Sequence, residues 1–194
     1  GIYATYCKHG SIFSKNKGQV NSTSSNYGIN LTHCDGTSGE EVYLTNNSVS
    51  CHKASSNSYG LSLNSLDHTK VYFNSINVTD GSSSGGRAVF ISSGSNIDLQ
   101  NNIFANTKES SGGYAIYTSS TSNISVSDYN DLYTNGTYLG YWYNSYKTNL
   151  ALWKSASGKD ENSISADPLF VSDSTLTPQS FKCDGQAIPI AAIA

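Results

Sequence analysis

Three aspartates are the residues of this 194-residue chain whose side chains could act in polysaccharide cleavage: Asp98, Asp128 and Asp131. A glycoside hydrolase uses two carboxyl groups roughly 5 to 9 Å apart, so the candidate pairs are Asp98 with Asp128 or with Asp131. A uronate lyase needs a basic residue and further cations around the substrate carboxylate, and the chain has a single arginine, Arg87. Because Asp98 and Asp128 also fit structural positions of a repeat, the sequence favours a non-catalytic protein, with a polysaccharide lyase or glycoside hydrolase as the alternative.

One outward position in each repeat of the chain is rich in aromatic side chains. Its members are Tyr3, Asn30, Ser62, Phe90, Tyr117 and Trp142. Rings exposed in a row can stack on sugars or dock a protein partner, so the four aromatic members are the predicted ligand-binding residues. The competing interpretation is that the C-terminal segment 148–190 lies over them.

Two of the four cysteines, Cys7 and Cys34, are one repeat apart. Parallel strands lie about 4.8 Å apart, within the roughly 4.4–6.8 Å Cα separation of a disulfide. We therefore predict a Cys7–Cys34 disulfide that joins the first two turns. Cys51 is expected in the core, and Cys183 has no assigned partner.

The four histidines lie early in the chain, and three of them are close to cysteines in sequence: His9, His33 and His52, with His68 apart from them. Adjacent residues of a strand point to opposite faces, so His33 and Cys34 could hardly bind the same ion. We expect surface histidines, and we predict neither a metal site nor another cofactor.

The elements that would position these residues come from a repeat. Segments beginning with Gly or Ala start at residues 1, 28, 60, 88, 115 and 140, at steps of 27, 32, 28, 27 and 25. Their second residues are Ile2, Ile29, Leu61, Val89, Ile116 and Tyr141. A second strand is expected at 42–44, 71–73, 97–99 and 124–126, and a third around Val49/Cys51, Ile76/Val78, Ile103/Ala105 and Asn130/Leu132. Strands that recur at a near-constant step bury their apolar faces by stacking, which predicts an all-β, parallel β-helix of about five to six turns over residues 1–147.

The strand corners and the two ends complete this prediction. Polar residues recur at the corners and are expected to form a hydrogen-bonded ladder: Asn46, Ser75, Asn101 and Asp128. Residues 148–194 are expected to cap the same domain, with Asn149 as the N-cap of a helix over 150–157 that ends at Gly158 and buries Leu150, Trp153 and Leu152. No comparable cap is expected at the N-terminal end, which predicts either preceding chain or head-to-tail self-association there.

Composition excludes two classes of partner. With one arginine, ten lysines and a net charge of -3, the chain has no basic patch for nucleic acid. No apolar run approaches the roughly 18 residues of a membrane span.

The strand and asparagine-corner pattern resembles the right-handed parallel β-helix family, the pectate-lyase-like superfamily. The stretch 127–133, followed by 150–170, resembles the C-terminal end of bacterial secreted or surface β-helix proteins. This resemblance implies an extracellular or cell-surface setting and functions that range from polysaccharide cleavage to adhesion. The expectation is a non-catalytic module that binds glycans or another protein surface, or forms part of an extracellular assembly.

Overall fold

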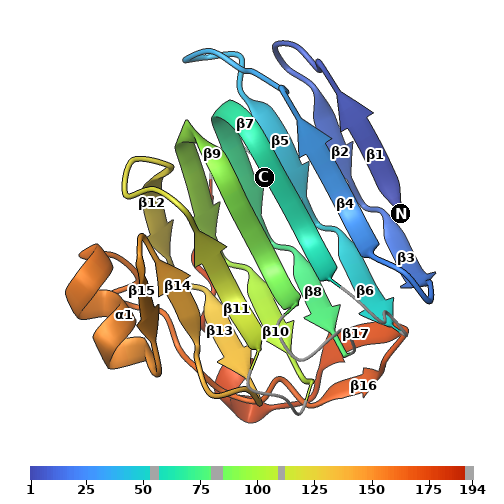
Figure 1. Cartoon of the computed structure of the whole chain (residues 1–194), viewed down its shortest axis with the longest axis vertical. Coiled ribbons are helices and arrows are strands. Elements are labelled where there is room, and N and C mark those ends of the chain that lie inside the picture. Colours follow the sequence, from blue (N-terminus) through green and yellow to red (C-terminus); the bar gives the residue numbers. More distant parts are fainter. Residues whose placement is uncertain (53–56, 80–84, 109–111, 191–194) are drawn as a thin grey trace.

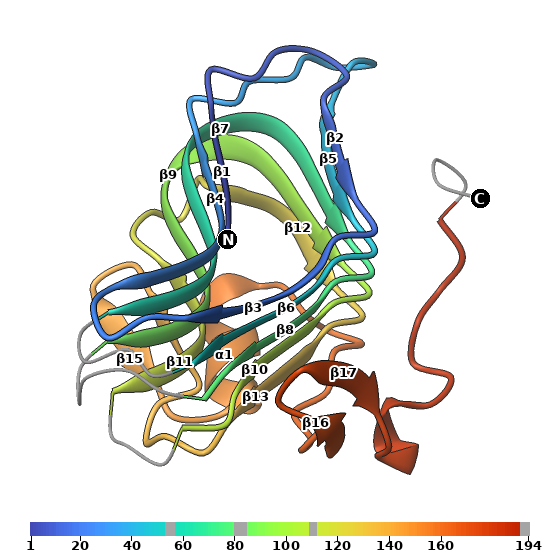
Figure 2. The same ribbon diagram turned by 90° about the vertical axis from the view of Figure 1, so that its right-hand side faces the viewer.

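The computed structural model describes residues 1–52, 57–79, 85–108 and 112–190. The chain winds into a parallel β-solenoid of about five turns with one short helix near its C-terminus, which confirms the predicted fold class. Figure 2 shows the strands gathered into three faces around a common interior. We call each turn of the solenoid a rung.

Equivalent strands of successive rungs pair in parallel. The first face contains β1 (Ile2–Thr5), β4 (Asn26–Thr32), β7 (Ser58–Tyr72), β9 (Gly86–Gln100), β11 (Gly113–Thr118) and β14 (Gly140–Trp142). The second face contains β2 (Ile12–Ser14), β5 (Val42–Thr45) and β12 (Ile124–Asp128), and the long strands β7 and β9 continue onto it. The third face contains β3 (Lys17–Asn21), β6 (Ser48–His52), β8 (Ser75–Val78), β10 (Ile103–Asn106) and β13 (Asp131–Thr134).

The core is a set of apolar side chains piled rung on rung. The predicted file is confirmed, since the following residues pair in register and are fully buried: Ile29, Leu61, Val89 and Ile116. Alternation with period two sends these residues inward and their neighbours outward. Burial of the file therefore fixes which side chains the first face presents to solvent.

Two parts of the predicted register were wrong. On the second face Leu44 pairs with Val71, so the expected alignment of Val42 with Val71 was off by two residues. On the third face Phe104, and not Ile103, pairs with Ile76. The rung step there is 28 residues, and a slip of one residue exchanges the two faces of a strand.

The Cys51 column changes for the same reason. Cys51 pairs with Val78 as expected, but the next member is Asn106, and Ala105 and Leu132 do not belong to this column. Cys51 itself is fully buried, as predicted.

Five asparagines, all of them buried except the half-buried Asn16, form a ladder at the corner between the second and third faces. The ladder consists of Asn16, Asn47, Asn74, Asn102 and Asn130, and each side-chain amide donates to the carbonyl oxygen of the next at 2.8–3.0 Å. The prediction of a ladder was right in kind, but its members were wrong. Asn46 and Asn101 lie one residue before a ladder member, Ser75 lies one residue after one, and Asp128 lies two residues before one. Asn46 and Asn101 instead adopt left-handed backbone with φ of 57° and 58°, which turns the chain just before each ladder residue.

A helix covers the last rung. Helix α1 (Leu150–Ser157) begins at Asn149, whose side chain accepts the Leu152 N–H at 2.9 Å, and ends at Gly158 with φ of 66°. Trp153 is fully buried against the core, and Leu150 is partly buried. Leu152 is half exposed, so its expected burial was wrong, because it lies on the outer side of the helix.

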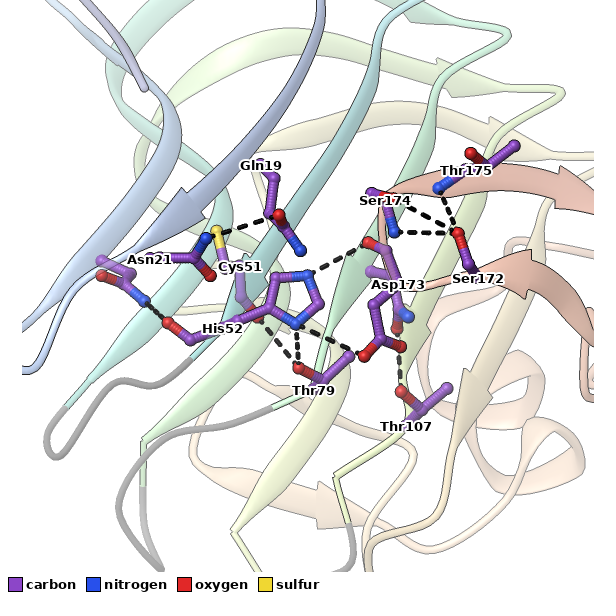
Figure 3. Close-up of polar contacts among 12 residues, drawn as sticks. Gln19, Asn21, Cys51, His52, Thr79, Thr107, Ser172, Asp173, Ser174 and Thr175 are labelled. Atoms are coloured by element: carbon purple, nitrogen blue, oxygen red, sulfur yellow. Dashed lines mark hydrogen bonds and ion pairs between the residues drawn. The ribbon is translucent and has the colours of Figure 1, made fainter.

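The chain then returns along the outside of the third face (Figure 2) as β16 (Phe170–Ser172), β17 (Thr175–Pro178) and a 3-10 helix, Phe181–Cys183. Figure 3 shows His52 of β6 between this hairpin and the sheet. Its Nε2 lies 3.1 Å from the Asp173 carbonyl oxygen and its Nδ1 lies 2.6 Å from Thr79 Oγ1. Beyond the 3-10 helix, the chain is bound to Asn101, whose side chain forms two hydrogen bonds with the Ile188 backbone. His52 is thus buried, and the expectation of a surface histidine was wrong there.

The two ends of the solenoid differ. At the C-terminal end β14 pairs with β15 (Ser145–Lys147) and Ile164 bridges β13, whereas β1, β2 and β3 form the N-terminal edge of the described chain. No helix in the described ranges is long and apolar enough to cross a membrane.

Candidate functional site

The predicted outward column exists on the first face with one correction. Tyr3, Asn30, Ser62, Phe90 and Tyr117 follow one another in register, and the next member is Tyr141. Trp142 pairs with Thr118, points inward and is 7% exposed, so it is a core residue and not a ligand-binding candidate. The last step is 24 residues, and the predicted 25 placed Trp142 on the wrong face.

A second outward column runs beside the first and was missed from the sequence. Its members are Tyr27, Tyr59, Arg87 and Tyr114, each three residues before a member of the first column. These positions recur at the same steps of 32, 28 and 27 as the apolar file. The repeat therefore contained the signal that could have found them.

Together the columns form a continuous surface of rings, which we call the aromatic stripe: Tyr27, Tyr59, Phe90, Tyr114, Tyr117, Tyr138, Tyr141 and Tyr146. Neighbouring ring centroids are 5.1 Å apart from Tyr27 to Tyr59 and 4.4 Å apart from Tyr117 to Tyr141. At the C-terminal end Tyr146 of β15 stacks on Tyr138 at 4.7 Å. The stripe thus runs from the second rung to the β14–β15 hairpin, across strands that lie side by side in Figure 1.

Arg87 is embedded in the middle of the stripe. Its guanidinium carbon lies within cation–π range of four ring centroids, at 4.5 Å for Tyr117, 5.1 Å for Phe90, 5.3 Å for Tyr59 and 5.9 Å for Tyr114. Its Nη1 donates to the Tyr59 hydroxyl at 3.0 Å. A cation over several ring faces is attracted to their π electrons, so Arg87 holds the rings of three rungs in place.

A groove of about 650 Å³ opens at the N-terminal half of the stripe. It is lined by Tyr3, Tyr27, Asn30, Thr32, Tyr59, Ser62, Asn64, Phe90 and Ser92. Its volume lies within the range of about 300–1,000 Å³ that is typical of small-molecule sites. The in-register column places Tyr3 and Phe90 at its two ends, with Asn30 and Ser62 between them.

The floor of this groove holds unused hydrogen-bonding groups. Asn30 is 7% exposed and Ser62 is 5% exposed. Within the described chain neither side chain makes a hydrogen bond, and Asn64 uses only its carbonyl oxygen, which accepts from Ser92 at 2.7 Å. Polar groups that lie in a groove without a protein partner are free to bind a ligand.

Two tyrosines of the stripe, Tyr27 and Tyr117, remain neutral hydrogen-bonding groups at physiological pH. Partial burial, with the neighbouring tyrosines, raises the pKa of Tyr27 above its ordinary value of 10.0. Burial also raises the pKa of Tyr117, with a further contribution from Tyr141 that Arg87 partly opposes.

The C-terminal segment does not lie over the stripe. Its contacts through His52 and Asn101 place it on the third face and the adjacent corner. At the two ends of the stripe, Tyr27 is 40% exposed and Tyr146 is 53% exposed. The competing interpretation, in which residues 148–190 cover the rings, was therefore wrong.

Asp98 lies on the second face and has all the partners that a structural carboxylate needs. Its Oδ2 accepts from the Tyr72 hydroxyl at 2.6 Å and from Lys70 Nζ at 3.2 Å, and its Oδ1 accepts from Gln100 at 2.9 Å. The corrected register places Asp98 beside Lys70, where the sequence had aligned it with Tyr72.

Asp128 and Asp131 hold the C-terminal segment to the last rung. Asp128 accepts from the backbone and side-chain amides of Asn162 at 2.7 and 2.8 Å. Asp131 accepts from the Ala166 N–H at 2.9 Å and from the Cys183 thiol at 3.3 Å, and burial raises its pKa to about 6. Each candidate carboxylate thus serves a different structural contact.

Cys7 and Cys34 lie side by side, as predicted, with free thiols and with the Cys7 N–H 3.4 Å from Cys34 Sγ. Burial, then the hydrogen bond with the Cys7 thiol, raises the pKa of Cys34 to about 12. The disulfide stays a prediction: thiol titration of the denatured, non-reduced protein should find two free thiols, and four would contradict it.

In the described part of the chain no three His, Cys, Asp or Glu side chains are grouped so that they could hold a metal ion. Comparison with known proteins gave no match to a family model, to a curated protein or to a solved structure.

Proposed function

We propose that this protein is a non-catalytic glycan-binding module that holds its ligand along the aromatic stripe. The observation that supports this most is the juxtaposition of a row of rings, most of them at least partly exposed, with a groove whose floor carries unpaired amide and hydroxyl groups. We further propose a secreted or cell-surface setting, in which such binding would serve adhesion or an extracellular assembly.

Sugars match this surface in two ways. A pyranose ring exposes apolar C–H groups on its faces and hydroxyls around its edge. Aromatic rings bury the apolar faces, and a few well-placed polar groups fix the orientation of the edge. Rings placed on successive rungs suit an elongated chain better than a compact small molecule.

The enzyme alternative has less support. A hydrolase needs paired carboxyl groups that reach the bound sugar, whereas the stripe and its groove contain no carboxylate among their members. The three candidate aspartates are hydrogen-bonded to Lys70, Tyr72 and Gln100, to Asn162, and to Ala166 and Cys183.

Tyr117→Ala should weaken glycan binding about tenfold or more, because Tyr117 joins the rings of three rungs and central aromatic contacts dominate binding energy. The matched control is Tyr43→Ala, which removes another half-buried, outward tyrosine, on the second face. Glycan-array screening followed by calorimetric titration of the best ligand measures both variants.

Two results would contradict the proposal. Equal loss of binding in Tyr117→Ala and Tyr43→Ala, with both variants folded, would place the site elsewhere. Release of sugar products that is abolished by Asp98→Ala or Asp128→Ala in a folded protein would favour the polysaccharide lyase or hydrolase.

A further inference from the structure

We propose that the glycan bound by the stripe is uncharged, so that the groove selects a neutral polysaccharide over a polyuronate. This inference rests on the proposed function and narrows the class of its ligand.

The lining of the groove is the first argument. All nine lining residues are neutral: four aromatic rings, three hydroxyl side chains and two asparagines. Amides and hydroxyls both donate and accept, which is what sugar hydroxyls require. A carboxylate only accepts and loses much of its hydration on entering a groove, and no lining residue carries a compensating charge.

The position of the nearest cation is the second argument. Arg87 is surrounded by the four rings described above, and Nη1 is already bonded to Tyr59. Its Nε is buried and has no partner among the described residues, so this nitrogen is turned away from solvent and from any ligand in the groove. The guanidinium is therefore packed among the rings, and Arg87 is not one of the residues that line the groove.

No lysine is among the residues that line the groove. Lys70 lies on the second face and forms an ion pair with Asp98 at 3.2 Å. A polyuronate presents a negative charge on every sugar, so its recognition needs a row of cations along the chain. The overall charge of -3 also disfavours approach of a polyanion.

The arrangement suggests how a neutral chain would lie. Tyr3 and Phe90 bound the polar floor along the solenoid axis, and Tyr27 and Tyr59 stand along one side. Sugar faces would stack on the rings while an edge hydroxyl reaches the Asn30 amide.

Asn30→Ala should then weaken glycan binding about threefold to tenfold, because it removes one hydrogen bond to the ligand. The control is Asn21→Ala, at an exposed asparagine of β3.

The decisive experiment uses probes that differ only in charge. Calorimetric titration would compare a galacturonic acid hexasaccharide with its fully methyl-esterified form, beside neutral hexasaccharides of glucose, mannose, xylose and galactose. We expect one or more neutral probes to bind, the ester to bind at least about tenfold more tightly than the free acid, and the neutral Kd to change less than about twofold between roughly 50 and 500 mM salt.

The outcomes separate the two proposals. If the free acid binds as tightly as its ester or more tightly, and weakens as salt rises, the neutral-ligand inference is overturned while glycan binding stands. If none of the probes, charged or neutral, binds in the titration and array screening gives no ligand, the proposed function fails, and this inference fails with it.

Discussion

Asn102→Leu is expected to lower the free energy of unfolding by about 3 to 5 kcal/mol, because it interrupts the asparagine ladder at a buried position. The Asn102 amide donates to the Val71 carbonyl at 2.8 Å and to Asn130 Oδ1 at 3.0 Å. Its carbonyl oxygen accepts from both the backbone and the side-chain nitrogen of Asn74. Leucine has a similar volume but supplies none of these groups.

The size of the loss in stability follows from the buried backbone groups that Asn102→Leu leaves without a hydrogen-bond partner. The Asn74 N–H and the Val71 carbonyl would lose partners in a region without access to water, at about 1–3 kcal/mol for each group. The corner also carries the left-handed residue Asn101, so backbone strain there would no longer be offset by the ladder bonds.

Chemical denaturation followed by circular dichroism measures this change. Asn21→Leu, at an exposed position of the same polar type, should change stability by less than about 0.5 kcal/mol. Asn102→Ala avoids overpacking and should still cost about 2 to 4 kcal/mol. Similar stabilities for Asn102→Ala and Asn21→Leu would show that the ladder contributes little.

The asparagine ladder is a feature that could be predicted from the sequence only in part. Its existence followed from polar residues at repeating corners, but its members did not, since Asn46 and Asn47 are both asparagines and a pattern cannot say which one turns the backbone. Left-handed backbone is open to asparagine, so residue type suits either position. Only the hydrogen bonds distinguish them.

The register errors have one physical source. The apolar file of the first face was predictable because Ile29, Leu61 and Val89 are large aliphatic residues at nearly equal steps. Steps of 24, 27, 28 and 32 residues occur in the same solenoid, and turns absorb the difference. Trp142 was placed on the outer face by mistake, because one residue more or less in a turn moves every later side chain of the strand to the opposite face. Its residue type gave no warning, since aromatic side chains occupy both the core and the outer surface of this face.

The candidate site was half visible from the sequence. Tyr3, Phe90 and Tyr117 were found because they alternate with the core file. Arg87 belongs to the second outward column, whose members recur at the same steps as the core file. Their mixed residue types, three tyrosines and one arginine, make this column harder to recognise in the sequence. Tyr146 reaches the stripe through an antiparallel hairpin, which lies outside the repeat, so no periodicity could have placed it.

Trp153→Ala is expected to destabilise the protein by about 4 to 5 kcal/mol, because Trp153 joins the capping helix to the last rung. The indole is fully buried and packs edge-on against Trp142, with centroids 5.3 Å apart and planes at 85°. Its Nε1 donates to Asp160 Oδ2 at 2.7 Å. Removal of the indole would create a cavity and leave a buried carboxylate short of one donor.

Asp160 extends this contact into the ladder. Its other oxygen accepts from Asn130 at 3.1 Å, from Ser127 at 2.9 Å and from Ser163 at 2.7 Å. The capping helix is thus linked to the asparagine ladder through Trp153, Asp160 and Asn130. A cap held in this way shields the last strands, which would otherwise expose their edges.

Two further variants separate packing from hydrogen bonding. Trp153→Phe keeps most of the ring and loses the N–H, so it should cost about 1–3 kcal/mol. Leu152→Ala, at the half-exposed neighbouring position of the same helix, should cost less than about 1 kcal/mol. If the denaturation midpoints of Trp153→Ala and Leu152→Ala coincide, the helix is not anchored to the last rung through Trp153.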